Sequence, residues 1–281
     1  MIANPPIMLV DKSTAKDDKR SCGSGSLDFD IDILGQKLNL TVIVAHKQAR
    51  LSDIVPLAQS LSNKITNLVI ESMCSDGSCI PCTKGCSDCC HYLLPVSVPE
   101  IFYLREEILT GHLPQQKLLL RSCLLAAKNF LKHKPPGWLV NTDSTASPDT
   151  PVSLDLLSNW YSGLNVPCPF LCKSECIIYN QRPFGCREHF VKGSPRACKS
   201  RCGTAEVAQV PIQMSEVLAK LAASIEGTDI ETVMMPLAMV WSEMNLFRHK
   251  RTWPTTALIK CFIEIVRSMV LKNSETVMGY A

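Results

Sequence analysis

The segment CSDGSCIPCTKGCSDCC, residues 74–90, contains six of the fifteen cysteines in this chain of 281 residues. A second segment, residues 168–202, contains six more and begins CPFLCKSEC. Thiolates about two to four residues apart can converge on one cation, because a turn brings them close together. These first and second cysteine segments therefore predict a metalloprotein, with twelve candidate ligands: Cys74, Cys79, Cys82, Cys86, Cys89, Cys90, Cys168, Cys172, Cys176, Cys186, Cys198 and Cys202.

A disulfide framework is the alternative, and several features of the chain argue against it. Disulfide-dense domains are usually small and secreted, whereas this chain is long enough for a large domain or two ordinary ones. The apolar run at residues 7–10 is shorter than the hydrophobic region of a signal peptide and no basic residue precedes it. The number of cysteines is odd. We therefore expect a reduced metal site in a cytoplasmic protein.

Composition narrows the classes of partner. The chain is 46% hydrophobic and 20% charged, which suits a globular protein with a substantial core. A net charge of +3 is too small to indicate nucleic-acid binding. No uninterrupted apolar run approaches the ~20 residues that a membrane-spanning helix needs. We therefore expect neither a nucleic-acid partner nor a membrane partner.

Hydrophobic periodicity predicts a mainly α protein of the α+β class. Residues 26–45 alternate between apolar and polar side chains around Gly35, which predicts an N-terminal β-hairpin. Ser97 and Glu100 form a capping box that opens a helix. Apolar residues at helical spacing predict helices at residues 51–73, 98–111, 114–133, 154–161, 212–226, 230–247 and 255–271. The helix at 230–247 is expected either to kink at Pro236 or to begin there.

These elements suggest four regions in the chain. Residues 1–25 are polar and predict a flexible tail, and residues 26–73 contain the hairpin and the first helix. Residues 74–202 form the predicted metal-binding domain, including a long loop at 134–152, and residues 203–281 form a helical region packed on it. The expected fold is thus a β-hairpin followed by helices around a metal-nucleated, irregular core rich in cysteine.

The second cysteine segment carries a set of short motifs. They are Cys168-Pro-Phe-Leu, Cys176-Ile-Ile-Tyr, Arg182-Pro183 and Cys186-Arg187. With these motifs the chain resembles the YkgJ-type cysteine-cluster family, which is described as a zinc- or iron-chelating domain and joins an N-terminal CxxCxxCC block to such a C-terminal block. Cys82, Cys86, Cys89 and Cys90 match the first block with three residues rather than two between Cys82 and Cys86. This insertion leaves open whether Cys79 or Cys82 is the first ligand.

The resemblance implies a set of eight metal ligands, which we call the core ligand set. Its members are Cys82, Cys86, Cys89, Cys90, Cys168, Cys176, Cys186 and Cys198. Cys74, Cys79, Cys172 and Cys202 are extra to the family pattern and could complete a further site, so one to three metal centres are possible. Basic residues at 182–201 would offset the negative charge of thiolate-bound metal, although an ordinary basic surface loop is an equal alternative. His91 is a possible replacement ligand, and Tyr179 and His189 are candidates for polar chemistry.

Three functions compete for such a site. The leading hypothesis is an iron–sulfur protein, with a [4Fe–4S] cluster or thiolate-bound iron, in a redox or group-transfer reaction. One branch of the family, the flagellin lysine N-methylases, combines an iron–sulfur cluster with S-adenosylmethionine, which implies methylation of a protein or peptide substrate. The alternative is a non-catalytic zinc protein in which four-cysteine sites hold helices together. The third is storage or delivery of metal, for example copper(I).

Overall fold

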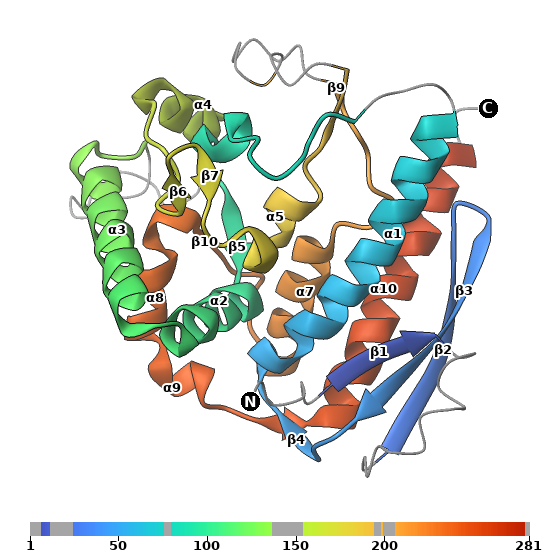
Figure 1. Cartoon of the computed structure of the whole chain (residues 1–281). Helices are drawn as coiled ribbons and strands as arrows, with labels where there is room; N and C mark the ends of the chain where they lie inside the picture. The colour runs from blue at the N-terminus through green and yellow to red at the C-terminus, as the bar shows by residue number, and fades with distance from the viewer. Residues whose placement is uncertain are drawn as a thin grey trace, which may run out of the picture.

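The computed structural model describes residues 7–11, 25–75, 80–136, 154–193, 198 and 206–278. In these ranges the protein is α+β and mainly helical, with an antiparallel sheet at one side and α3 (Leu113–Lys132) at the other (Figure 1). The predicted class is therefore confirmed. Most of the long loop at 134–152, most of the predicted tail, and Cys79 and Cys202 lie outside the described residues.

The sheet contains the predicted hairpin and one further strand. Strands β2 (Gly25–Ile33) and β3 (Gln36–Val44) pair antiparallel around Leu34 and Gly35, which both have a positive φ. β1 (Ile7–Asp11) pairs with the other edge of β3, so the sheet order is β1-β3-β2. The prediction of a flexible tail is therefore wrong for residues 7–11. Their apolar run is too short to predict a strand alone, and β3 supplies the partner.

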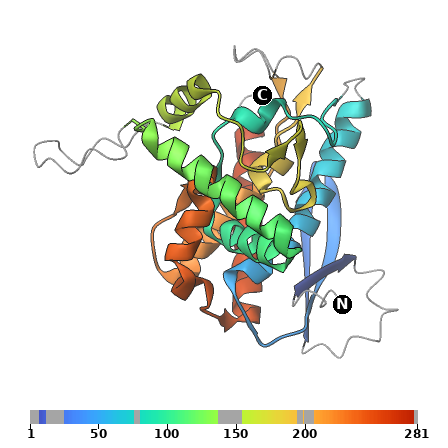
Figure 2. The ribbon, with the colours of Figure 1, turned by 60° about the vertical axis from the view of Figure 1, so that its left-hand side comes forward.

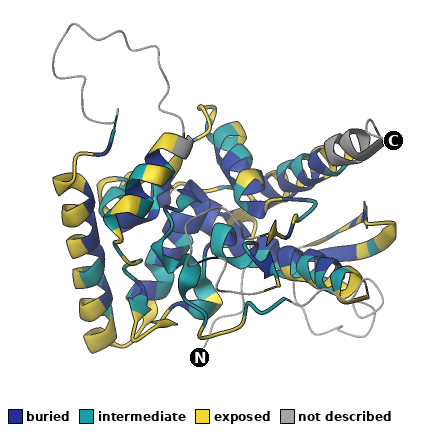
Figure 3. Cartoon of the chain, turned by 90° about the horizontal axis from the view of Figure 1, so that it is seen from above, coloured by how far each residue is buried: buried dark blue, intermediate teal, exposed yellow. Residues whose placement is uncertain are grey.

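The larger core lies between this sheet and four helices. The helices are α1 (Val55–Ser75), α2 (Val98–Thr110), α7 (Met214–Glu226) and α10 (Thr255–Met278). Phe29 and Leu40 from the sheet share this core with Leu61 of α1 and Phe262 of α10. Viewed from above, the inner faces of the helices are buried and the outer faces exposed, as the helical spacing predicts (Figure 3).

A second core lies under α3. It is formed by α2, α3, α4 (Leu154–Leu164) and α8 (Ala238–Met244), and α3 crosses it on the outside of the molecule (Figure 2). Ser97 and Glu100 form the predicted capping box at the start of α2, and Gly111 ends that helix as expected. Cys123 of α3 is buried in this core. This position is typical of a cysteine that acts as a small apolar core residue.

Of the two alternatives for residues 230–247, a helix kinked at Pro236 or one that begins there, the structure agrees with the second. Thr232–Met234 forms β10, which pairs antiparallel with β5 (Pro95–Ser97), and Met235–Leu237 forms the short helix η4. Helical structure then continues as α8 and α9 (Leu246–His249). The apolar spacing alone does not distinguish these states. The strand forms because β5, far away in the sequence, offers unpaired backbone groups.

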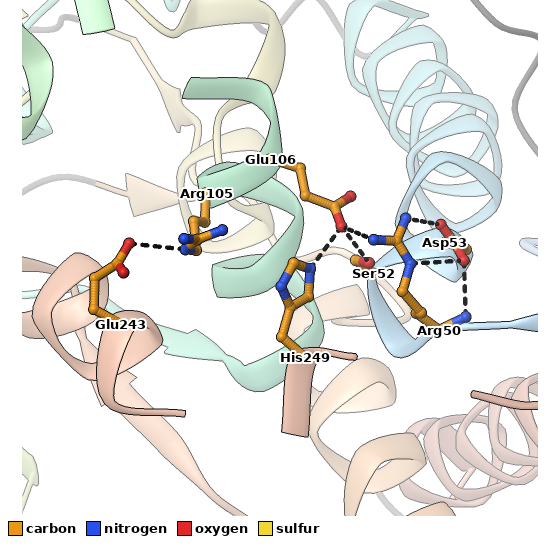
Figure 4. A network of polar contacts seen from close by, with 7 residues as sticks. All are labelled: Arg50, Ser52, Asp53, Arg105, Glu106, Glu243 and His249. Atoms are coloured by element: carbon orange, nitrogen blue, oxygen red, sulfur yellow. Dashed lines mark hydrogen bonds and ion pairs between the residues drawn. The ribbon is translucent and has the colours of Figure 1, made fainter. Parts of the chain in front are cut away.

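A polar network holds the start of α1 against α2 and α9 (Figure 4). Glu106 of α2 accepts hydrogen bonds from Arg50, from the hydroxyl of Ser52 at 3.4 Å, and lies 2.6 Å from Nε2 of His249. Asp53 binds Arg50 in turn. The helix predicted from residue 51 therefore begins as η1 (Leu51–Ile54), with Arg50 rather than Ser52 at its N-cap. Ser52 binds Glu106 instead.

Short strands complete this side of the fold. β4 (Gln48–Ala49) pairs with β11 (Trp253–Pro254), directly before α10, and fixes that helix near the sheet. Within the described ranges, no helix is long and apolar enough to cross a membrane.

Candidate metal centre

Both cysteine segments are built from short elements. In the chain, the first segment follows α1 and the second follows α4 (Figure 1). In the first segment, Cys89 and Cys90 lie on the single 3-10 turn η2 (Asp88–His91). In the second, β6 (Leu171–Cys172) and β7 (Glu175–Cys176) form a tight hairpin, followed by η3 (Tyr179–Gln181). Cys186 lies on the four-residue helix α5 (Phe184–Arg187). A further short pair follows, β8 (Val191–Lys192) with β9 (Glu206–Val207).

Two hydrogen bonds join the two cysteine segments directly, and a third joins the second segment to Tyr92, two residues after the first segment. The amide of Cys168 donates to the carbonyl of Cys90 at 2.7 Å. The Tyr92 hydroxyl donates to the carbonyl of Cys198 at 2.7 Å, and the amide of Val191 donates to Sγ of Cys82 at 3.5 Å. The segments are thus adjacent in space despite their separation in the sequence, as the family pattern implies.

Two neighbouring cavities lie between the segments. The first, of about 160 Å³, is lined by thiols and by apolar side chains such as Leu93, Phe170 and Ile178. The second, of about 210 Å³, has thiols facing Arg182, Arg187 and His189. The cysteines of the first cavity are Cys86, Cys89, Cys90, Cys168, Cys176 and Cys186, and those of the second are Cys82, Cys86, Cys89, Cys186 and Cys198. Every member of the core ligand set therefore lines at least one cavity.

The four cysteines outside that set behave differently. Cys74, near the end of α1, and Cys172, on β6, are exposed and line neither cavity. Cys79 and Cys202 lie outside the described residues. The structure thus brings together the eight cysteines selected by the family pattern and leaves the two described extras on the surface. Cys82, one of the two alternatives for the first ligand, lines the second cavity.

The thiols surround the cavities without converging on one point. In the part of the chain that the structure describes, no group of three or more Cys, His, Asp or Glu side chains is close enough to hold a metal ion. The predicted metal-nucleated core is therefore not seen as a formed coordination site. The chemistry of the donors fits a thiolate-bound metal, because soft sulfur ligands suit zinc, copper(I) and iron–sulfur clusters.

The environment of the cavities favours neutral thiols over thiolates. A hydrogen bond with Cys90, together with burial, raises the pKa of Cys89. Burial raises the pKa of Cys168 to about 12, and burial and the neighbouring Cys168 raise that of Cys186 well above its usual value. A bound cation reverses this preference, because a coordinated thiol loses its proton. Thiolate formation here would therefore be coupled to metal binding.

Two buried carboxyl groups hold α5, and with it Cys186, in place. Oε1 of Glu100 accepts a hydrogen bond from the amide of Phe184 at 2.7 Å, at the start of α5. Glu188, which follows α5, accepts hydrogen bonds from the hydroxyl of Ser62 at 2.7 Å and the amide of Met214 at 3.1 Å. Helices α1, α2 and α7 therefore position a helix too short to be stable alone.

Burial raises the pKa of both carboxyl groups, because it removes them from water. Burial raises the pKa of Glu188 to about 8, against hydrogen bonds that lower it. Burial likewise raises the pKa of Glu100. From the sequence, Glu100 is predicted only as a helix cap, and no role is predicted for Glu188. The sequence does not predict that these two residues position α5. Their partners Phe184, Ser62 and Met214 are remote in the sequence, and two of the three contribute only a backbone amide.

Two arginines from the predicted basic set face the second cavity. Arg182 lies 3.6 Å from the ring centroid of Tyr179, and its Nε donates to the carbonyl of that residue at 2.9 Å. Nε of Arg187 donates to the carbonyl of Arg182 at 2.8 Å. Lys192 instead forms an ion pair with Glu206 at 2.6 Å, and Arg196, Lys199 and Arg201 lie outside the described residues. Arg182 and Arg187 are thus the cations placed to offset thiolate charge.

Two histidines have buried nitrogens without a hydrogen-bond partner in the described structure. They are Nδ1 of His91 and Nε2 of His189. His189 lines both cavities and stands edge-on to Tyr92, with 5.9 Å between ring centroids, whereas His91 lines neither. Burial lowers the pKa of His189, so its neutral form, which can bind a metal, is favoured.

Comparisons of this chain with known proteins found no relative. A scan against protein-family models, a search of curated proteins and a search of solved structures each found no match to this chain.

Proposed function

We propose that this chain is a cysteine-ligated metalloprotein, with an iron–sulfur cluster or thiolate-bound iron as its cofactor in a redox or group-transfer reaction. The observation that carries the proposal is the gathering of all eight members of the core ligand set around two neighbouring cavities. These cysteines come from several short elements of two distant cysteine segments. Hydrophobic packing alone gives no reason to collect so many thiols, since Cys123 shows how an ordinary core cysteine is placed.

The state of the cysteines supports metal binding over disulfide bonding. All described cysteines are free thiols, including the eight that line the cavities. Adjacent Cys89 and Cys90 interact with each other through a side-chain hydrogen bond.

The residues around the thiols suit a charged cluster. Four thiolates on zinc or on an oxidised [4Fe–4S] cluster leave a net negative charge, and Arg182 and Arg187 line the second cavity as compensating cations. When bound, an iron–sulfur cluster supplies electrons at a potential set by its surroundings. Phe170, Ile178 and Leu93 add apolar side chains to the lining of the first cavity. These residues would tune the potential of the cluster.

The methyl-transfer prediction rests on the family resemblance. It requires S-adenosylmethionine and a protein or peptide substrate in addition to the cluster. The non-catalytic zinc protein is the second candidate. It is favoured by the way α5 ties α1, α2 and α7 together through Glu100 and Glu188, since closed zinc sites commonly hold such small elements in place. Metal storage or delivery is the third.

Elemental analysis and absorption spectroscopy of the full chain, purified without oxygen, test the proposal. Iron with absorbance near about 400 nm, the region of thiolate-to-iron charge transfer, is the expected result. Stoichiometric zinc in a colourless protein would favour the structural alternative. Variable stoichiometry and easy loss of metal to a chelator would favour storage, and a chain that binds no metal would refute all three.

Cys89→Ser provides the site-specific test, with Cys172→Ser as its matched control. Cys89 lines both cavities, whereas Cys172 lies in the same kind of segment but is exposed and lines neither. We expect Cys89→Ser to lose most of the bound metal and become less soluble, because the cysteine segments have little apolar core of their own. Cys172→Ser should keep its metal. Equal metal content in the two variants would remove Cys89 from the ligand set.

A further inference from the structure

The second cavity contains a polar atom whose position is unexplained. Nε2 of His189 is buried and has no hydrogen-bond partner within the described residues, although the ring lines the cavity beside Cys82, Cys86 and Cys198. Buried polar side-chain atoms nearly always have hydrogen-bond partners, and an atom without one often marks the position of a bound water molecule or ion. His189 follows Cys186 by three residues, in the segment that contacts with α1, α2 and α7 hold in place.

The eight thiols divide unequally between the two cavities. Cys90, Cys168 and Cys176 line only the first, and the thiols that interact with Cys186 include those of Cys168 and Cys176. These four form one set. Cys82 and Cys198 line only the second cavity, and each interacts with the thiol of Cys86. Cys86, Cys89 and Cys186 line both cavities; their thiol neighbours place Cys186 with the first set and Cys86 with the second, whereas Cys89 neighbours members of both. The first set thus has four thiols of its own, whereas the second has three.

We propose that His189 is a metal ligand, and that its Nε2 joins Cys82, Cys86 and Cys198 in a mixed cysteine–histidine centre beside a four-cysteine centre. The inference rests on the proposed function and extends it to two chemically different sites. Four donors complete a tetrahedral site for zinc, and three thiolates with one imidazole form an established type of ligand set.

Two neighbouring contacts orient the proposed ligands. Tyr92 stands edge-on to the ring of His189, and its hydroxyl binds the carbonyl of Cys198 at 2.7 Å. One side chain therefore contacts two of the four proposed ligands. Sγ of Cys82 accepts the amide of Val191 at 3.5 Å, which is the kind of hydrogen bond that supports a metal-bound thiolate. The four donors surround the cavity without meeting at a point, so ion binding has to draw them together.

X-ray absorption at the edge of the metal in the purified full chain tests the assignment. We expect sulfur and nitrogen scatterers together, at about 2.3 Å and about 2.0–2.1 Å if the metal is zinc, with outer-shell scattering from an imidazole ring. His189→Gln should remove the nitrogen signal and about one metal equivalent per chain, because a four-ligand site loses one donor. The sulfur-only signal of the other centre should remain.

Two further variants separate ligation from a structural role. His91→Gln is the matched control, because His91 also has a buried unpartnered nitrogen but lines neither cavity, and it should keep both signals. His189→Cys should keep the metal and replace nitrogen by sulfur, and it remains informative if His189→Gln does not fold. A nitrogen signal that persists in His189→Cys would overturn the inference.

The wild-type spectrum separates the two proposals. Metal bound through sulfur alone would overturn the role of His189 while leaving the proposed function intact. A chain without bound metal would overturn the proposed function and this inference together.

Discussion

The region around Phe262 and the region around Cys186 are both enclosed by the fold, but their neighbours differ in kind. Phe262 has no exposed surface and packs among apolar side chains from the sheet, α1, α7 and α10. Cys186 lies on a four-residue helix and lines two cavities among other thiols. The first region is stabilised by burial of apolar surface. In the second, buried apolar side chains such as Phe170 lie beside the thiols, and the position of Cys186 depends on the carboxyl groups of Glu100 and Glu188 and, in our proposal, on metal.

This difference shows that hydrogen bonds to the surrounding helices position the short elements of the cysteine region. Glu100 accepts a hydrogen bond from the start of α5, and Glu188, directly after α5, accepts one from the start of α7. Burial of these two carboxyl groups costs free energy, because it removes them from water. That cost is offset by the hydrogen bonds they accept. The regular helices therefore act as a scaffold, and the short elements between them carry the donor atoms.

Phe262→Ala should have the largest effect on global stability. It leaves a cavity in the larger core, so we expect a loss of about 3–5 kcal/mol in the free energy of unfolding, measured by denaturant titration. Phe247→Ala is the control, because Phe247 is 83% exposed and its truncation should change stability by less than about 0.5 kcal/mol. Equal effects would refute the assignment of the larger core.

Glu100→Gln should have an intermediate effect that depends on pH. The amide replaces one acceptor oxygen with a donor, so Ser97 or Phe184 loses its partner and stability falls by about 1–3 kcal/mol. Because burial raises the pKa of Glu100 in the folded state, its protonated form is favoured, and its contribution is lost as pH rises through that pKa.

The sign of this dependence can be measured directly. The stability difference between the wild type and Glu100→Gln should widen as pH falls through the raised pKa of Glu100 toward the usual pKa of a free carboxyl group, because the wild type gains stability while the variant lacks the titrating group. Arg187 opposes the raised pKa of Glu100, and the nearby Glu188 titrates in both proteins. A difference that narrows toward low pH would show that Glu100 is charged in the fold.

Gly185→Ala should have a smaller effect that is concentrated in the cysteine region. A Cβ at this position would lie 2.4 Å from Cδ1 of Leu94, so one of the two side chains has to move. We expect a loss of about 1–2 kcal/mol, typical of overpacking, together with weaker metal binding through the neighbouring Cys186. Gly163→Ala is the matched control, because no atom lies near its added Cβ.

A double-mutant cycle tests the cause of that effect. In a Leu94→Ala background, Gly185→Ala should cost much less, because the clashing methyl group is absent. An unchanged cost would place the strain elsewhere in α5.

Lys64→Ala should have the smallest effect. Lys64 of α1 forms an exposed ion pair with Asp11 of β1 at 2.9 Å, and such pairs contribute about 0–1 kcal/mol. Ile7→Ala, in the same strand, should cost at least about 1 kcal/mol because Ile7 is buried in the larger core. A larger loss from Lys64→Ala in thermal melts would mean that β1 is held by charge rather than by apolar contacts.

Local features of the sequence were enough for most of the regular elements. Alternating residues predicted β2 and β3, the capping box at Ser97 and Glu100 predicted the start of α2, and Gly111 predicted its end. Each of these signals is local, because a helix or hairpin satisfies its backbone hydrogen bonds within a few residues. The eight cysteines that line the cavities were also selected by spacing and family pattern alone.

The errors fall where a distant partner decides the structure. β1 required β3, and β10 required β5, so residues 7–11 and 232–234 could not be assigned from their own patterns. The second roles of Glu100 and Glu188 and the orphan nitrogen of His189 were likewise not visible in the sequence. Each of these features depends on which residues from other parts of the chain contact the side chain.

The sequence by itself thus determined the α+β class, the hairpin, most helices and the identity of the clustered thiols, because periodicity, capping and cysteine spacing are local properties. Only the tertiary structure decided how those thiols divide between two cavities, which extra cysteines stay on the surface, and that carboxylates from α2 and the end of α5 set the position of Cys186. Those features arise from contacts between residues far apart in the chain, and no local pattern encodes them.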